Sequence, residues 1–209
     1  HFLYNETISA AYASVDAEKG KWHWQAGLRY EFTHYKAHQL GNAVVKDAAF
    51  KRNYGSIFPT AFVAYQLDSN NSITLRAGKR IDRPAFQHLN PFQTILNKYT
   101  YEAGNPFIKP QYTWNFSLAH TYKQKLTTEV SYSYLKDYFS QIFIIDSSSS
   151  NVNNNIIIYT RGNVGSFKDF AITETYQTPV TKWWNLTAVA VYNYKVIKGI
   201  VWAPFTARI

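Results

Sequence analysis

The sequence predicts an all-β fold, and three observations support this prediction. In the stretch WHWQAGLRYEF at residues 22–32, every even position is apolar or aromatic and every odd position is polar or glycine. Because successive residues of a strand point to opposite faces of a sheet, this period of two indicates a strand with two different faces. No segment of helical length has an apolar period of 3.6. Aromatic residues make up 18% of the chain and charged residues only 17%, a composition that a soluble core of this size does not require.

Each expected strand is supported by its own alternation. The segments, in chain order, are about 6–13, 22–32, 57–67, 72–81, 114–122, 127–134, 156–177 and 184–196. Their apolar rows include Ile8, Ala10 and Tyr12; Trp24, Ala26 and Leu28; Ala61, Val63 and Tyr65; Ile73, Leu75 and Ala77; Trp114, Phe116 and Leu118; Val130, Tyr132 and Tyr134; and Leu186, Ala188 and Ala190. The segment 156–177 is less regular, and GNVGSFKDF in its middle predicts a bulge or a bend. We therefore expect about eight strands.

The connections between these strands alternate in length. Those near 16–21, 68–71, 123–125 and 178–182 are short and rich in turn-forming residues, whereas those at about 36–53, 81–111 and 146–155 are long. In an antiparallel meander, all the short turns then lie at one end of the sheet and all the long loops at the other. This asymmetry is typical of outer-membrane β-barrels.

The aromatic residues suggest that the apolar face meets lipid. Trp and Tyr prefer the membrane interface, and the expected interface girdle consists of rings near strand ends: Trp22, Trp24, Tyr30, Phe32, Trp183, Trp184, Tyr192 and Tyr194. The residues between them, such as Leu28 and Ala188, are small or aliphatic. The run 22–32 also has the roughly 9–11 residues that a tilted membrane strand needs, whereas typical globular strands are about 5–6 residues long.

The polar face carries formal charges in the middle of strands. Arg29, Glu31, Arg76 and Glu129 would each cost several kcal/mol if buried unpaired in a protein core, on the order of the penalty for a buried ion. In a wet lumen they cost little, so we expect these four residues to face the lumen of a barrel. A soluble β-protein, such as a sandwich or a carbohydrate-binding domain with its apolar face inside, is the alternative.

The direction of the strands predicts a portion of a barrel. The first and the last strand would both have their free ends on the long-loop side, and their open edges would be exposed to lipid, which is not tolerated. The tail IVWAPFTARI shows no closing strand. We therefore expect residues 1–209 to be part of one antiparallel transmembrane β-barrel domain in the outer membrane of a Gram-negative cell, with further strands outside this chain.

The basic surface favours a lipid partner. The formal net charge is +9, but the Lys and Arg residues are scattered singly, so we expect no nucleic-acid partner. Such a surface suits outer-membrane lipid and lipopolysaccharide. The chain has no Cys, which excludes disulfides and thiolate sites.

The long loop carries motifs that resemble a known family. In RIDRPAFQHLNPFQTILNKYTYEAGNPFIKPQYTWN, an Arg-Pro is followed by Leu-Asn-Pro-Phe and by Gly-Asn-Pro with a later Lys-Pro. With GLRYEFTHY, YGSIFPTAFVAYQL and YTRGNVGSFKDFAITETY, this resembles the barrel domain of TonB-dependent receptors over roughly residues 20–195. The resemblance implies a roughly 22-stranded barrel with a plug domain that imports scarce solutes using energy from TonB, contacted through an N-terminal region absent from this chain. A non-transporting barrel that serves as a structural or assembly partner, for instance of surface lipoproteins, is the alternative function.

The candidate site residues lie in this loop. Long loops on rigid scaffolds often carry function, and the ligand-facing candidates are Arg80, Arg83, His88, Asn90 and Tyr99. The competing reading is that the loop prolines only stiffen the connection, with a turn at Gly104-Asn105. No catalytic motif, metal site or cofactor site is expected: the spacing of His34 and His38 brings ligands together on a helix but not on a strand. We expect no enzymatic activity.

Overall fold

The computed structural model describes residues 1–41, 47–146, 156–200 and 204–208. Within these residues, one sheet contains 11 strands, and its main path runs β1-β2-β3-β4-β7-β8-β9-β10-β11. The elements are β1 (Phe2–Lys19), β2 (Trp22–Gln39), β3 (Ala48–Gln66), β4 (Asn71–Asp82), α1 (Phe86–Leu89), β5 (Gln93–Asn97), β6 (Thr100–Ala103), β7 (Gln111–Tyr122), β8 (Leu126–Asp146), β9 (Ile156–Pro179), β10 (Asn185–Ile200) and β11 (Pro204–Arg208).

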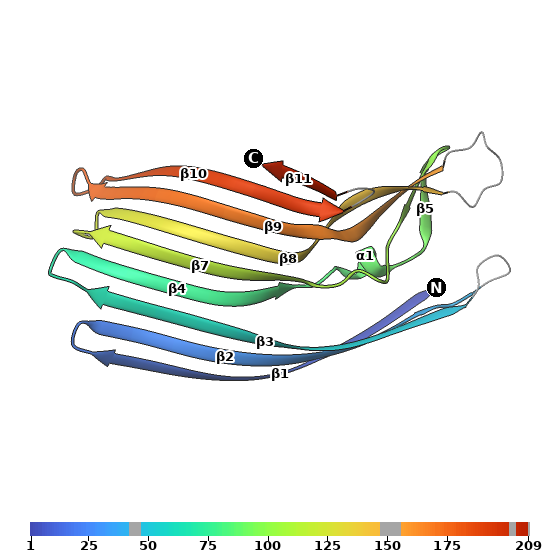
Figure 1. Ribbon diagram of the computed structural model, residues 1–209, viewed down its shortest axis with the longest axis horizontal. Coiled ribbons are helices and arrows are strands. Elements are labelled where there is room, and N and C mark those ends of the chain that lie inside the picture. The colour runs from blue at the N-terminus through green and yellow to red at the C-terminus, as the bar shows by residue number, and fades with distance from the viewer. Residues whose placement is uncertain (42–46, 147–155, 201–203, 209) are drawn as a thin grey trace.

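The sheet is a curled antiparallel meander that forms a half-barrel (Figure 1). The predicted all-β class and the eight long strands are confirmed, with β5, β6 and β11 as short additions. The four short turns lie together at one end and the long connections at the other (Figure 1). The N-terminus lies at the long-loop end, as expected (Figure 1).

Several expected boundaries are wrong because the strands are longer than the alternating segments that predict them. β2 continues to Gln39 and β3 begins at Ala48, so the connection expected at 36–53 is much shorter; residues 42–46 of it lie outside the described residues. The connection expected at 146–155 lies outside them from residue 147 onward. The tail is not free of strand structure, since β11 pairs antiparallel with β10.

The irregularity expected in GNVGSFKDF is confirmed. The register of β8 against β9 shifts at Lys136/Tyr138 and at Tyr138/Phe139, opposite Gly165 and Asn163. Asp137 in this bulge has a φ of 58°, and Gly165 has a φ of 146° where a side chain would meet the Lys198 carbonyl. The bulge therefore marks the level at which the upper, long-loop part of the wall changes direction.

The pairing register assigns each residue to one of two faces. We call the face that bears Arg29, Glu31, Arg76 and Glu129 the inner face, and the opposite one the outer face. The apolar rows through Leu28, Leu75 and Leu118 lie on the outer face. The expectation for the first strand is wrong, since Ile8, Ala10 and Tyr12 pair with Thr33, Glu31 and Arg29 and so lie on the inner face. Register with the neighbouring strand decides the face, and apolarity alone does not.

The connection between β4 and β7, residues 83–110, folds back over the inner face, and we call it the inner segment. It contains the one-turn helix α1 and the hairpin β5–β6 (Figure 1). β6 pairs parallel with the upper part of β9 at Thr100↔Ile157 to Glu102↔Tyr159. The inner segment therefore reaches from β2 and β3 on one side of the half-barrel to β9 on the other.

Candidate functional site

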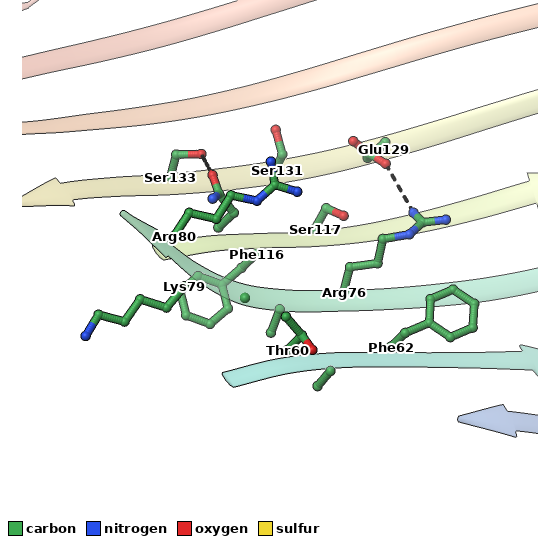
Figure 2. A pocket seen from close by; sticks show the side chains of 14 residues that line it. Thr60, Phe62, Arg76, Lys79, Arg80, Phe116, Ser117, Glu129, Ser131 and Ser133 are labelled. Atoms are coloured by element: carbon green, nitrogen blue, oxygen red, sulfur yellow. Dashed lines mark hydrogen bonds and ion pairs between the residues drawn. The ribbon is translucent and has the colours of Figure 1, made fainter. Parts of the chain in front are cut away.

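A hollow of about 450 Å³ lies on the inner face of β3, β4, β7 and β8 (Figure 2). Arg76 Nη1 lies 3.6 Å from Glu129 Oε2, and its guanidinium lies over the Phe62 ring at 5.5 Å. The remaining polar lining is supplied by Thr60, Lys79, Arg80, Asn115, Ser117, Ser131 and Ser133. Because both arginines are exposed, this hollow can offer charge-assisted donors and hydroxyl groups to a polar or anionic solute.

Arg83 fastens the start of the inner segment to the wall. Its Nη2 donates to Glu31 Oε2 at 2.6 Å and to Thr33 Oγ1 at 3.1 Å. Glu31 is only 7% exposed, and its other oxygen accepts from Arg29 Nε at 2.7 Å. A nearly buried carboxylate between two guanidinium groups is compensated on both sides. The geometry thus gives Arg83 a structural contact where the sequence predicted a ligand contact.

The returning half of the inner segment is held by three side chains of the wall. Arg52 donates to the carbonyls of Ile108 at 2.7 Å and Phe107 at 3.3 Å. Tyr35 Oη donates to the Pro106 carbonyl at 3.4 Å. On the opposite side, Asn163 accepts from the Lys109 amide at 2.7 Å and donates to its carbonyl at 3.0 Å. The inner segment is therefore fixed at both sides of the half-barrel.

A second hollow, of about 320 Å³, lies between α1, the β5–β6 hairpin and β9. Its lining includes Gln87, His88, Asn90, Glu102 and Arg161. Among the described residues, the buried Nδ1 of His88 has no hydrogen-bond partner. Burial, and then the positive charge of Arg161, lower the pKa of His88 below its ordinary value of 6.5. The ring is therefore neutral at pH 7.

The sequence matches the model of the outer membrane protein beta-barrel family over residues 1–205. This chain belongs to that family. The protein is thus an outer-membrane barrel protein of a Gram-negative bacterium, as the alternation and the turn asymmetry predicted. A search of curated proteins finds no match to the sequence.

Solved structures with the same fold include receptors and transporters at low sequence identity. The copper transporter OprC has a TM-score of 0.64 at 13% identity, over 90% of this chain and 29% of its own. The hemophore receptor HasR of Serratia marcescens has a TM-score of 0.59 at 13% identity, over 97% of this chain and 43% of its own. The siderophore receptor PirA of Pseudomonas aeruginosa has a TM-score of 0.56 at 8% identity, over 94% and 46%. This chain therefore spans less than half the length of these receptors.

Six of the eight rings that the sequence assigns to a membrane interface lie on the outer face. Trp22, Trp24, Tyr30, Phe32, Tyr192 and Tyr194 lie on it and are exposed. Trp184 directly precedes β10, and Trp183, 85% exposed, lies in the turn between β9 and β10. An exposed aromatic band is what the membrane interface stabilises. Among the described residues no helix is apolar and long enough to cross a membrane.

The five ligand candidates do not form one site. Arg80 lines the first hollow, His88 and Asn90 line the second, and Arg83 is bound to the wall. Tyr99 lies exposed in the β5–β6 turn, and its carbonyl accepts from the Ile157 amide. In the described parts of the chain, no three His, Cys, Asp or Glu side chains meet as metal ligands.

Sequence reasoning missed the residues of the second hollow that come from β9. Arg161 and Tyr159 lie about 70 residues beyond His88 and reach the hollow because β6 pairs with β9. The sequence places Asn163 only within an expected bulge or bend. In GNVG, the Asn163 amide directly follows a glycine, which has no Cβ. This is the sequence signal that could have suggested a side chain hydrogen-bonded to the backbone of another segment.

Proposed function

We propose that this protein takes up a scarce solute across the outer membrane through a plugged barrel, using energy from TonB. The observation that carries the proposal is the likeness in fold, over at least 90% of this chain, to OprC, HasR and PirA. Those proteins are described as a copper transporter, a hemophore receptor and a siderophore receptor. In this proposal the chain has no catalytic role and contributes wall, interface rings and one solute-facing segment.

The inner face is the solute path in this proposal. Arg29, Glu31, Arg76 and Glu129 face the lumen, and the inner segment narrows it from above. Solutes that carry negative charge or many hydroxyl groups would first meet the hollow with His88, Asn90 and Arg161 and then the hollow with Arg76 and Arg80. Fixed donors on a rigid wall favour such solutes because little side-chain ordering is needed on binding.

The chain in this proposal is part of one barrel domain, with the plug and the remaining strands contributed by the rest of the protein. Two observations support this. The chain spans less than half of the similar receptors. In the described residues, one edge of β1 is unpaired, and an open edge is not tolerated in lipid. TonB would contact the plug side of the protein and not residues 1–209.

Whole-cell uptake tests the proposal. A strain lacking the gene is compared with its parent, and with a strain lacking TonB, for accumulation of three probes: radioactive iron as ferric enterobactin, heme, and copper(II). We expect one probe to accumulate less in both mutants and to recover when the wild-type gene is restored. The double variant Arg76→Ala/Arg80→Ala should restore it only in part, because the first hollow loses both guanidinium groups.

The outcome that contradicts uptake is equal accumulation of all three probes with and without the gene. In that case the non-transporting alternative holds if a surface lipoprotein is lost from the outer membrane together with this protein. That result would leave the barrel fold and the outer-membrane location untouched, because both rest on the family match and the strand register.

A further inference from the structure

We propose that Lys136, Lys168 and Lys198, which we call the outer lysine cluster, form a binding site for the phosphate groups of lipopolysaccharide. This inference goes beyond uptake and does not depend on it. It concerns the outer face of β8, β9 and β10, on the side of the wall opposite to both hollows. The occupant follows from the level at which the three lysines lie and from the charge of the membrane leaflet found there.

The strand register places the three lysines together. Lys136 on β8 pairs with Ser166 on β9, which pairs with Lys198 on β10, so these residues form one row. Lys168 lies in the next row, opposite Tyr134 and Val196. With strands about 4.8 Å apart, the Cα atoms of Lys136 and Lys198 are roughly 10 Å apart, and Lys168 lies about 7 Å from Ser166. Three flexible ammonium groups can therefore converge on one phosphate, with the Ser166 hydroxyl between them.

The rows beneath the cluster identify its face. In order towards the short turns they are Tyr134–Lys168–Val196, Tyr132–Phe170–Tyr194, Val130–Ile172–Tyr192, Thr128–Glu174–Ala190 and Leu126–Tyr176–Ala188. These rows are mostly apolar and aromatic and belong to the outer face. The Lys168 ammonium lies over the Tyr134 ring at 5.7 Å, which agrees with a common face. The lysines thus begin where the lipid-facing band ends.

The length of β8 between Leu126 and Lys136 gives the depth of the outer lysine cluster in the membrane. Ten residues separate Leu126, the first residue of β8, from Lys136. They rise about 33 Å along the strand, and a tilt of about 40° reduces this to roughly 25 Å along the barrel axis. The apolar band of an outer-membrane barrel is about 25 Å tall, and its long loops are extracellular. The cluster therefore lies at the headgroups of the outer leaflet, where lipopolysaccharide carries its phosphates.

No carboxylate of the described residues neutralises the cluster. Among the described residues, none of the three lysines forms an ion pair. Asp169, next to Lys168, points to the inner face and lies 4.0 Å from Lys195. The outer-face carboxylate Glu174 lies three rows below Lys168 and accepts from Thr128 at 2.9 Å. An unneutralised group of three cations at this level attracts a polyanionic headgroup.

Binding of lipopolysaccharide to the purified full-length protein tests the proposal. The probe is lipopolysaccharide with phosphorylated lipid A, added to protein in mild detergent and followed by native mass spectrometry. The variant is Lys136→Gln/Lys168→Gln/Lys198→Gln. Its matched control, Lys123→Gln/Lys125→Gln/Lys182→Gln, removes three lysines from the short turns at the other end. We expect the first variant to bind roughly tenfold more weakly or worse, and the control to bind like wild type.

Two further arms keep the result interpretable. Wild type should bind dephosphorylated lipopolysaccharide as weakly as the variant binds the phosphorylated form, and should prefer lipopolysaccharide to phosphatidylglycerol. Equal binding by variant and wild type, or equal binding of phosphatidylglycerol, overturns the proposal. If the triple variant does not assemble, Lys198→Gln alone should weaken binding, and wild-type-like binding by that single variant then counts against the site.

Discussion

Arg83 illustrates how a single residue determines the position of the inner segment. Replacing it with Ala removes its hydrogen bonds to Glu31 and Thr33. A hydrogen bond to a charged group contributes about 1.5–3 kcal/mol to stability. We expect residues 84–110 to exchange their amide hydrogens faster in Arg83→Ala. Arg80→Ala is the control, because Arg80 has no hydrogen bond or ion pair in the part of the chain that the structure describes. Equal exchange in both variants would show that Arg83 does not hold the segment.

Gly104 is a second single position on which the segment depends. Its amide donates to the Asn90 carbonyl at 2.8 Å, and a Cβ there would clash with that same carbonyl and with the backbone of Gln87. We expect Gly104→Ala to displace the β5–β6 hairpin and to open the second hollow, since backbone atoms cannot give way as a flexible side chain can. Faster cleavage of the inner segment by an added protease would reveal this. Wild-type cleavage of Gly104→Ala would contradict the tight approach.

His88 gives the inner segment a dependence on pH. Its pKa is lowered in the folded state, so the unfolded or detached segment binds a proton more readily. The contribution is constant above the ordinary pKa of 6.5, and the segment becomes less stable as the pH falls below that value. Hydrogen exchange of residues 84–110 should therefore accelerate between pH 7.5 and pH 5 in the wild type. In His88→Gln this acceleration should be smaller; an identical pH profile would exclude His88 as its source.

At the residue scale, the sequence predicts where a residue lies better than which residues it contacts. The motif RIDRP correctly places Arg83 in a long loop, but nothing near it identifies Glu31, 52 residues earlier, as its partner. Likewise His88 and Asn90 are identified as polar loop residues, whereas Arg161 reaches them only through the pairing of β6 with β9. Contacts of this kind depend on how distant strands are set against one another, and a local pattern does not contain that information.

At the scale of the strand, alternation predicts the faces wherever one face is strongly apolar. This holds for 22–32, whose even residues lie on the outer face. It fails for Ile8, Ala10 and Tyr12, which lie on the inner face. The residues on the opposite face of this strand, Ser9, Ala11 and Ala13, are small enough to suit the outer face. It also misses the upper half of β2, where Thr33, Tyr35, Ala37 and Gln39 are buried under the inner segment and by the neighbouring strands. Where protein covers a strand, its two faces no longer meet lipid and water. The residues of the two faces then no longer differ clearly in polarity.

The two faces of a strand should respond differently to a new charge. Leu28 and Ala188 lie on the outer face, and Ser131 lies on the inner face. An Arg at the level of the bilayer midplane on the lipid side costs about 2–4 kcal/mol, so Leu28→Arg and Ala188→Arg should reduce the amount of folded protein in the outer membrane. Ser131→Arg should be milder because it meets a polar hollow. The readout is heat-modifiable migration of membrane extracts; equal losses for all three would contradict the assigned faces.

At the scale of the whole molecule, the exposed outer face determines the solvent that the protein requires. Trp22, Leu28, Leu118, Val130 and many other large apolar side chains are exposed together on one side of the sheet. A continuous apolar surface of this kind is stable against lipid and prone to association in water. We expect the full-length protein to be monodisperse in detergent and to aggregate when the detergent is removed, as followed by light scattering. A monodisperse detergent-free monomer would restore the soluble β-protein alternative.

The parallel pairing of β6 with β9 bears on how a solute would pass this end of the half-barrel in the uptake that we propose. Three successive residue pairs join the hairpin to the rim, and Asn163 and Arg52 tie down the chain that follows it. If the hairpin opened as a hinged flap, these main-chain hydrogen bonds would have to break at each opening. In that uptake the hairpin therefore acts as a fixed filter that sorts solutes by size, and any part that moves to open the path lies elsewhere.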